Sequence, residues 1–159
     1  MSAIPRAAPA SRLHYVILRA IDLTLWALQV LTGLLFLVFC ANKFNGGSVF
    51  WTSIFGKAGA NFWIEVFTKI GIGQWFRYFT GGLEMACGIL LFIPQTAGIA
   101  AALLACIMVG AILTHVLILR DGVALVVECA VLLAINCLIS WSRLPKLLRR
   151  KSSSSAAVQ

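Results

Sequence analysis

Residues 74–93, QWFRYFTGGLEMACGILLFI, form an apolar stretch that is long enough to cross a membrane and has Glu84 near its centre. A transmembrane helix needs about 20 mostly apolar residues. An ionisable side chain at such a depth is energetically costly and by default marks a functional site. His115 and Glu128 lie inside two further apolar stretches of the chain. The sequence therefore predicts a membrane protein with polar groups buried between its helices.

The composition of the whole chain agrees with this prediction. Of its 159 residues, 61% are hydrophobic and 11% are charged, and the mean hydropathy is +0.97. In soluble domains, roughly a quarter of the residues are charged. The composition therefore indicates an integral membrane protein and excludes an ordinary soluble domain.

Four apolar stretches predict the fold class, which is all-α: a transmembrane four-helix bundle. The stretches are Leu23–Ala41, Gln74–Ile93, Thr96–Leu119 and Gly122–Trp141. Very short links join the last three stretches. These links predict that the helices pack side by side as antiparallel neighbours within one domain.

Basic residues flank the outer ends of the first and last stretches, and they predict the orientation. They are Arg6, Arg12 and Arg19 before the first, and Arg143, Lys146, Arg149, Arg150 and Lys151 after the last. Cytoplasmic segments of membrane proteins are enriched in Lys and Arg, so both termini of this multi-pass protein are expected in the cytoplasm. The predicted organisation is a cytoplasmic arm over residues 1–15, a transmembrane domain over 16–142, and a basic, then Ser-rich cytoplasmic tail over 143–159.

These flanking residues account for most of the formal net charge of +8. Basic clusters beside transmembrane helices orient the chain and attract anionic lipid headgroups. Membrane lipid is therefore the expected partner of this charge, and nucleic acid is not.

The long connection between the first two stretches contains an amphipathic segment that begins at Asn61. Apolar side chains recur there at helical spacing, while Glu65 and Lys69 fall on the opposite face. The apolar positions are Phe62, Trp63, Val66, Phe67 and Ile70. The pattern predicts an extra interfacial helix between spans one and two. Two interpretations remain: a simple membrane anchor, or a lid over a pocket between the helices.

Helical spacing places the buried polar groups on inward faces. On the first helix, the stripe consists of Gln29, Gly33, Phe36, Cys40 and Lys43. On the second, Arg77, Gly81, Glu84 and Gly88 form a similar stripe.

Five ionisable residues are expected to share the outer, non-cytoplasmic half of the bundle, at a rise of about 1.5 Å per residue. They are the candidate ligand-binding residues: Glu84, His115, Glu128, Lys43 and Arg77. A carboxylate in hydrocarbon must be neutralised or paired, and the available partners of Glu84 are His115, Lys43, Arg77 and Arg120. The cluster is either a functional site or a buried ion-pair network that fixes the register of the helices.

Several short motifs resemble the DoxX-like family of four-helix membrane proteins. They are the helix start at Arg19, FCANKF at 39–44, GGLEMACGILL at 81–91 and AILTH at 111–115. The resemblance covers about Val16 to Trp141, in the family's order and spacing. It implies a membrane subunit rather than a defined enzyme: characterised relatives include small subunits of a thiosulfate:quinone oxidoreductase, membrane partners of thiol- and superoxide-handling enzymes, and animal proteins that act in receptor assembly.

Three functions are consistent with these features. In the first, the protein is a membrane subunit of an oxidoreductase system, whose bundle binds a quinone or similar lipid-soluble molecule through Glu84 and His115. In the second, it is a non-catalytic membrane partner or assembly factor. In the third, it is a small proton-coupled carrier that titrates at Glu84 and works as a homo-oligomer. A protein partner or self-association is expected in each case, and the catalytic residues and enzymatic status remain open.

The sequence offers little support for thiol or metal chemistry. The cysteines are Cys40, Cys87, Cys106, Cys129 and Cys137, and none of them forms a Cys-x-x-Cys pair. His115 is the single histidine within the spans, and the Glu-x-x-His pairs of di-iron bundles are missing. No metal site is therefore expected.

Overall fold

The computed structural model describes residues 9–47, 61–120 and 123–156, and it is all-α, as predicted. Its α-helices are α1 (Pro9–Asn45), α3 (Phe62–Ile70), α4 (Gln74–Leu91), α5 (Ala97–Leu113) and α6 (Val123–Ala156). A short π-helix, η1 (Thr114–Leu119), continues α5. All the predicted apolar stretches coincide with helices, and α1 and α6 extend well beyond the stretches that predicted them.

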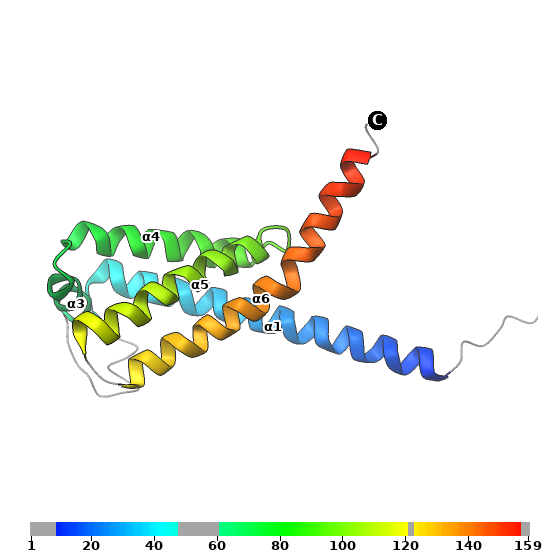
Figure 1. Ribbon diagram of the computed structural model, residues 1–159, viewed down its shortest axis with the longest axis horizontal. Helices are drawn as coiled ribbons and strands as arrows, with labels where there is room; N and C mark the ends of the chain where they lie inside the picture. Colours follow the sequence, from blue (N-terminus) through cyan, green and yellow to red (C-terminus); the bar gives the residue numbers. More distant parts are fainter. Residues whose placement is uncertain (1–8, 48–60, 121–122, 157–159) are drawn as a thin grey trace, which may run out of the picture.

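The four long helices lie alongside one another, and each runs opposite to the one before it (Figure 1). Helix α1 packs mainly against α4, and α5 packs mainly against α6. Helix α3 lies across one end of this bundle, and the start of α1 and the end of α6 extend beyond the opposite end (Figure 1). The tight link after α4 joins α4 and α5 at the end far from α3.

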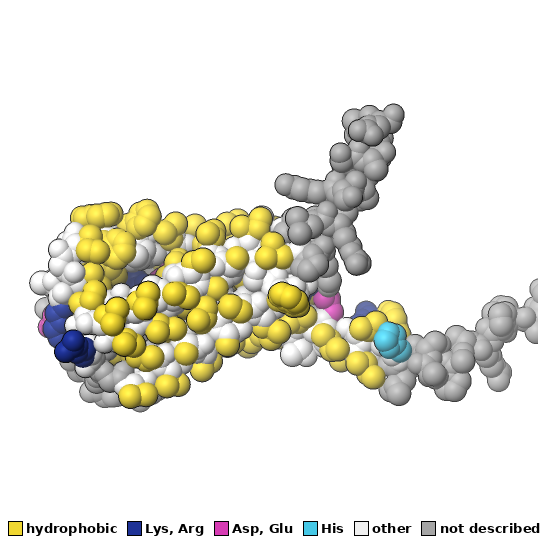
Figure 2. Space-filling model, in the orientation of Figure 1, with side chains coloured by type: hydrophobic (Ala, Val, Ile, Leu, Met, Phe, Trp, Pro, Cys, Tyr) yellow, Lys and Arg dark blue, Asp and Glu magenta, His cyan; other side chains and the backbone are white. Residues whose placement is uncertain are grey.

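Within the described residues, three helical segments are long and apolar enough to cross a membrane: His14–Asn45, Ala97–Leu119 and Val123–Leu144. The chain is therefore a multi-pass membrane protein. Helix α4 is not among these segments, because Gln74, Arg77 and Glu84 lower its hydropathy. Three of the predicted spans are thus found, and the four-span bundle is not established by these criteria. Figure 2 shows hydrophobic side chains covering the sides of the bundle, with charged side chains mostly at its ends.

The predicted inward stripes of α1 and α4 are both buried. They meet in a close crossing at Gly33 and Gly88. A Cβ atom added to Gly33 would lie 3.0 Å from the carbonyl oxygen of Gly88, and one added to Gly88 would lie 3.3 Å from that of Gly33. Only glycine allows the two backbones to approach so closely, so this contact fixes how α1 and α4 are placed along each other.

Candidate functional site

A cavity of about 350 Å³ lies at the α3 end of the bundle, and its lining comes from α1, α3, α4, α5, η1 and α6. Helices α4 and α5 diverge from their tight link toward this end (Figure 1). Figure 2 shows the surface hollowed between them there. Aromatic rings form much of the wall, namely Phe39, Phe62, Trp63, Phe67, Phe76 and Phe79. The cavity is therefore mainly apolar.

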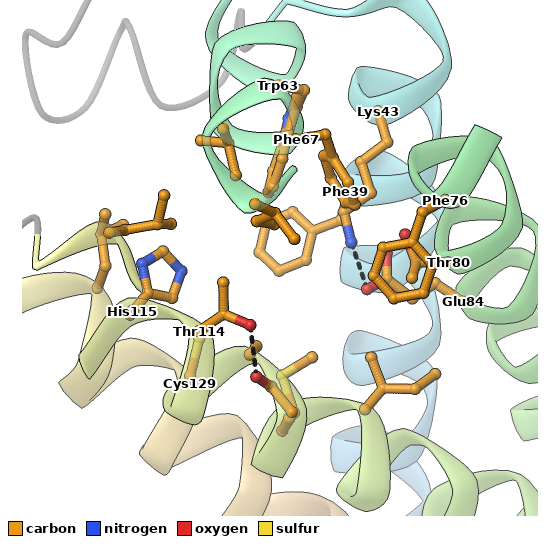
Figure 3. A pocket seen from close by; sticks show the side chains of 18 of the residues that line it. Phe39, Lys43, Trp63, Phe67, Phe76, Thr80, Glu84, Thr114, His115 and Cys129 are labelled. Atoms are coloured by element: carbon orange, nitrogen blue, oxygen red, sulfur yellow. Dashed lines mark hydrogen bonds and ion pairs between the residues drawn. The ribbon is translucent and has the colours of Figure 1, made fainter. Parts of the chain in front are cut away.

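A buried ion pair between Lys43 of α1 and Glu84 of α4 lies in the wall of the cavity (Figure 3). The Lys43 ammonium donates a hydrogen bond of 2.5 Å to Oε1 of Glu84. The two side chains are only 10% and 2% exposed. Lys43 also lies over the ring of Trp63, with its nitrogen 5.0 Å from the ring centroid. Of the partners that the sequence left open for Glu84, the structure thus selects Lys43.

Arg77 is buried beside this pair but does not line the cavity. Its guanidinium donates hydrogen bonds to the carbonyl oxygens of Lys43 and Phe44, at the end of α1. It also donates to the side chains of Gln74 and Tyr78. A cation that binds the last carbonyl groups of a helix also interacts favourably with the negative end of the helix dipole. Arg77 therefore holds the end of α1 that carries Lys43.

His115 and Glu128 also line the cavity, and both side chains are partly exposed. His115 is on η1, across the cavity from Glu84 (Figure 3). The backbone N–H of Arg120 donates to the carbonyl oxygen of His115 at 2.8 Å, which closes the π-helical turn. Such π-helical turns often occur at functional sites. The structure therefore brings four of the five predicted residues to one cavity, without pairing Glu84 with His115.

The position of helix α3 agrees with the interpretation of the amphipathic segment as a lid. The apolar residues of its predicted face all line the cavity. Its backbone is tied to the end of α1 by a hydrogen bond of 3.1 Å from the N–H of Trp63 to the carbonyl oxygen of Gly46. Gly46 has a φ of +80°, and a Cβ atom there would lie 2.8 Å from the side chain of Ile64. Helix α3 is therefore a cover of the cavity, held closely against α1.

A second polar cluster lies at the end of the bundle opposite α3, and the sequence pattern does not predict it as a unit. Arg143 of α6 donates hydrogen bonds to Gln29 and Asp22 of α1, at 3.2 and 3.1 Å. Gln29 in turn donates a hydrogen bond of 2.5 Å to the carbonyl oxygen of Leu91, at the end of α4. Gln29 was expected on a buried face, but Arg143 was interpreted only as a topological charge. This cluster joins α1, α4 and α6 far from the cavity.

The described part of the chain contains no cluster of three or more side chains that could bind a metal ion. No disulfide forms among Cys40, Cys87, Cys106, Cys129 and Cys137, all of which are described, and the first two are buried near Glu84. Cys129 lines the cavity.

Comparison with known proteins gives one family. The model of the DoxX-like family matches residues 27–138, which include α4, α5, η1 and most of the apolar parts of α1 and α6. No curated protein matches the chain, and no solved structure does.

Proposed function

The chain belongs to the DoxX-like family, and from its cavity we propose that it binds a quinone or a similar lipid-soluble molecule as the membrane subunit of an oxidoreductase system. The observation that carries this proposal is an apolar cavity, walled by aromatic rings, with a buried Lys43–Glu84 pair in its lining. Pockets for small organic ligands are typically 300–1,000 Å³ and mostly apolar, with a few polar groups that orient the ligand.

The size and the lining of the cavity suit the ring of such a molecule. At about 350 Å³ it holds one substituted ring system but not a long alkyl chain as well. Phe79 and Leu83 of α4 line the cavity and are nevertheless 54% and 39% exposed. They therefore lie at an opening between α4 and α5 through which an alkyl chain would reach the surrounding lipid.

The polar groups of the cavity would act on the ring. Lys43 is a hydrogen-bond donor in its wall, and His115, on the opposite side, can donate, accept or transfer a proton. In this proposal a partner protein supplies or removes the electrons. The alternative of a non-catalytic assembly factor would use the same ion pair only to hold α1 against α4.

Gly110 offers a direct test of ligand binding. It lines the cavity, and a Cβ atom added to it would meet nothing within 4 Å. Gly110→Leu should therefore fill part of the cavity without disturbing a packed contact, and the purified protein should lose its bound lipid-soluble molecule. The measurement is extraction of the protein purified in mild detergent, followed by mass spectrometry of the extract.

Gly82→Leu is the matched control for this experiment. Gly82 is also helical and also meets nothing within 4 Å, but it does not line the cavity. This variant should keep the ligand. Equal ligand content in the two variants would refute binding in the cavity. Wild-type protein without any extractable ligand, even after incubation with short-chain quinones and with the corresponding hydroquinones, would favour the assembly factor.

The proposed arrangement places α4 across the membrane as a fourth span, with both termini in the cytoplasm. Helix α4 has 18 residues and lies between α1 and α5 in the bundle. Short epitopes inserted at Ile72 and at Gln95, which flank α4 and are exposed, should then be accessible from opposite sides of the membrane. The epitope at Gln95 should share its side with tags at both termini. Access to both epitopes from one side would refute the crossing of α4.

A further inference from the structure

Within the described lining of the cavity, two buried polar atoms lack a hydrogen-bond partner: Nε1 of Trp63, which is a donor, and Oε2 of Glu84, which is an acceptor. Oε1 of Glu84 accepts the hydrogen bond from Lys43, but Oε2 is buried and has no hydrogen-bond partner among the described residues. Glu84 as a whole is 1% exposed. A buried polar atom that makes no hydrogen bond carries the full cost of its desolvation, so native structures normally give such an atom a partner. The partner of Oε2 must be a hydrogen-bond donor, because a carboxylate in an ion pair only accepts.

The neighbouring ammonium group adds a second requirement. The ammonium group of Lys43 has three N–H donors, and one of them donates to Oε1 of Glu84. Lys43 lines the same cavity. A group bound beside the pair therefore meets an acceptor on Glu84 and a donor on Lys43 at once. A hydroxyl satisfies both, since it donates one hydrogen bond and accepts others. A ketone or an ether oxygen accepts from Lys43 but leaves Oε2 without a partner.

From this geometry we infer that the cavity takes the hydroxyl-bearing form of its ligand: a lipid-soluble phenol or hydroquinone rather than the corresponding ether or quinone. The inference rests on the proposed function, because it assigns the chemical class of the molecule bound in that cavity. The hydroxyl donates to Oε2 of Glu84 and accepts from Lys43. The ring lies among the aromatic side chains, and any alkyl chain leaves between Phe79 and Gly110.

The Lys43–Glu84 pair thus selects between ligands, whereas the aromatic wall can bind any flat apolar molecule. Lys43 and Glu84 are kept in place from outside the cavity, because Arg77 binds the carbonyl oxygen of Lys43 and the close crossing of α1 and α4 fixes their register. Neither contact involves the ligand. The donor and the acceptor are therefore already placed before the ligand binds.

The test compares 2-naphthol with 2-methoxynaphthalene. These two probes share one ring system, and methylation removes the hydrogen-bond donor while adding a single methyl group. Both probes are small enough for the cavity. Binding is measured by fluorescence titration of the protein in lipid nanodiscs, with Gly110→Leu nanodiscs as the blank for partition into lipid. We expect 2-naphthol to bind at least about tenfold more tightly, the factor typical of a lost hydrogen bond to a charged group.

A variant in which both members of the pair are neutral provides the second arm. Lys43→Met with Glu84→Gln keeps the shape of the cavity and replaces the charged acceptor by a neutral one. The preference for 2-naphthol should therefore fall to about fivefold or less, in the range of a neutral hydrogen bond and below the preference of the wild type. Equal affinities of the wild-type protein for the two probes would overturn the hydroxyl assignment and leave the proposed function standing. Failure of both probes to bind above the Gly110→Leu blank would overturn the proposed function as well.

Discussion

Replacement of Lys43 by methionine is expected to lower the free energy of unfolding by about 3–5 kcal/mol, the usual cost of removing one partner from a buried ion pair. The variant leaves the carboxylate of Glu84 in an apolar wall without its cation. Glu84→Gln should have a similar effect, because it leaves the ammonium group of Lys43 buried alone. The measurement is the free energy of unfolding in mixed micelles, from titration with a denaturing detergent.

The double variant, Lys43→Met with Glu84→Gln, should recover most of this loss. Replacing both members of a buried pair by uncharged residues of similar size is often neutral or stabilising, because no charge has to be desolvated. Glu65→Gln is the matched control, since Glu65 is an exposed carboxylate on α3. Its effect should stay within about 0.5 kcal/mol. A double variant as unstable as the singles would show that the two side chains are not coupled.

These variants also separate the structural from the functional role of the pair. If the pair only holds α1 against α4, the double variant should regain both stability and biological activity. If it also binds the ligand, stability should return while the preference for a hydroxyl falls. The two readouts therefore decide between an assembly factor and a ligand-binding subunit.

The second large effect is expected at the crossing of α1 and α4. Gly88→Leu should lower the free energy of unfolding by about 1–3 kcal/mol, as overpacking of a close contact does. Even the first added carbon would lie 3.3 Å from the carbonyl oxygen of Gly33, and the rest of the leucine side chain would reach Leu37. The same unfolding titration measures the effect.

Gly82→Leu serves again as the control, because it adds the same side chain to the same helix where nothing lies within 4 Å. The free energy of unfolding of Gly82→Leu should be at least that of the wild type, since leucine has a higher helix propensity than glycine. An unchanged stability of Gly88→Leu would mean that α1 and α4 do not cross at this point. The Gly88 variant should also weaken the Lys43–Glu84 pair, because the crossing sets the distance between the helices that carry it.

The family match covers the cavity but only part of the second polar cluster. The match to the DoxX-like family spans residues 27–138, so it includes the whole lining of the cavity but excludes Asp22 and Arg143. The hydrogen bonds from Arg143 to Gln29 and Asp22 tie α6 to α1.

Much of the fold follows from the sequence alone. The apolar stretches determine the helices, since about 20 apolar residues can satisfy their backbone in a membrane only as a helix. The period of the helix determines which residues share a face, and the stripes that include Lys43 and Glu84 are buried as their spacing predicts. The amphipathic segment at 62–70 likewise forms α3. All of these properties are local: each depends on residues within a few turns of one helix.

The pairing within the site was decided only by the tertiary structure. Lys43 and Glu84 are far apart in the sequence, and spacing on each helix left His115, Arg77 and Arg120 open beside Lys43 as partners of Glu84. Which residue pairs with Glu84 depends on how far α1 is shifted along α4 and on the rotation of α1 about its own axis. The contact between Gly33 and Gly88 sets that shift, and the divergence of α4 and α5 opens the cavity that keeps His115 away. These are relations between helices, and the period of a single helix carries no information about them.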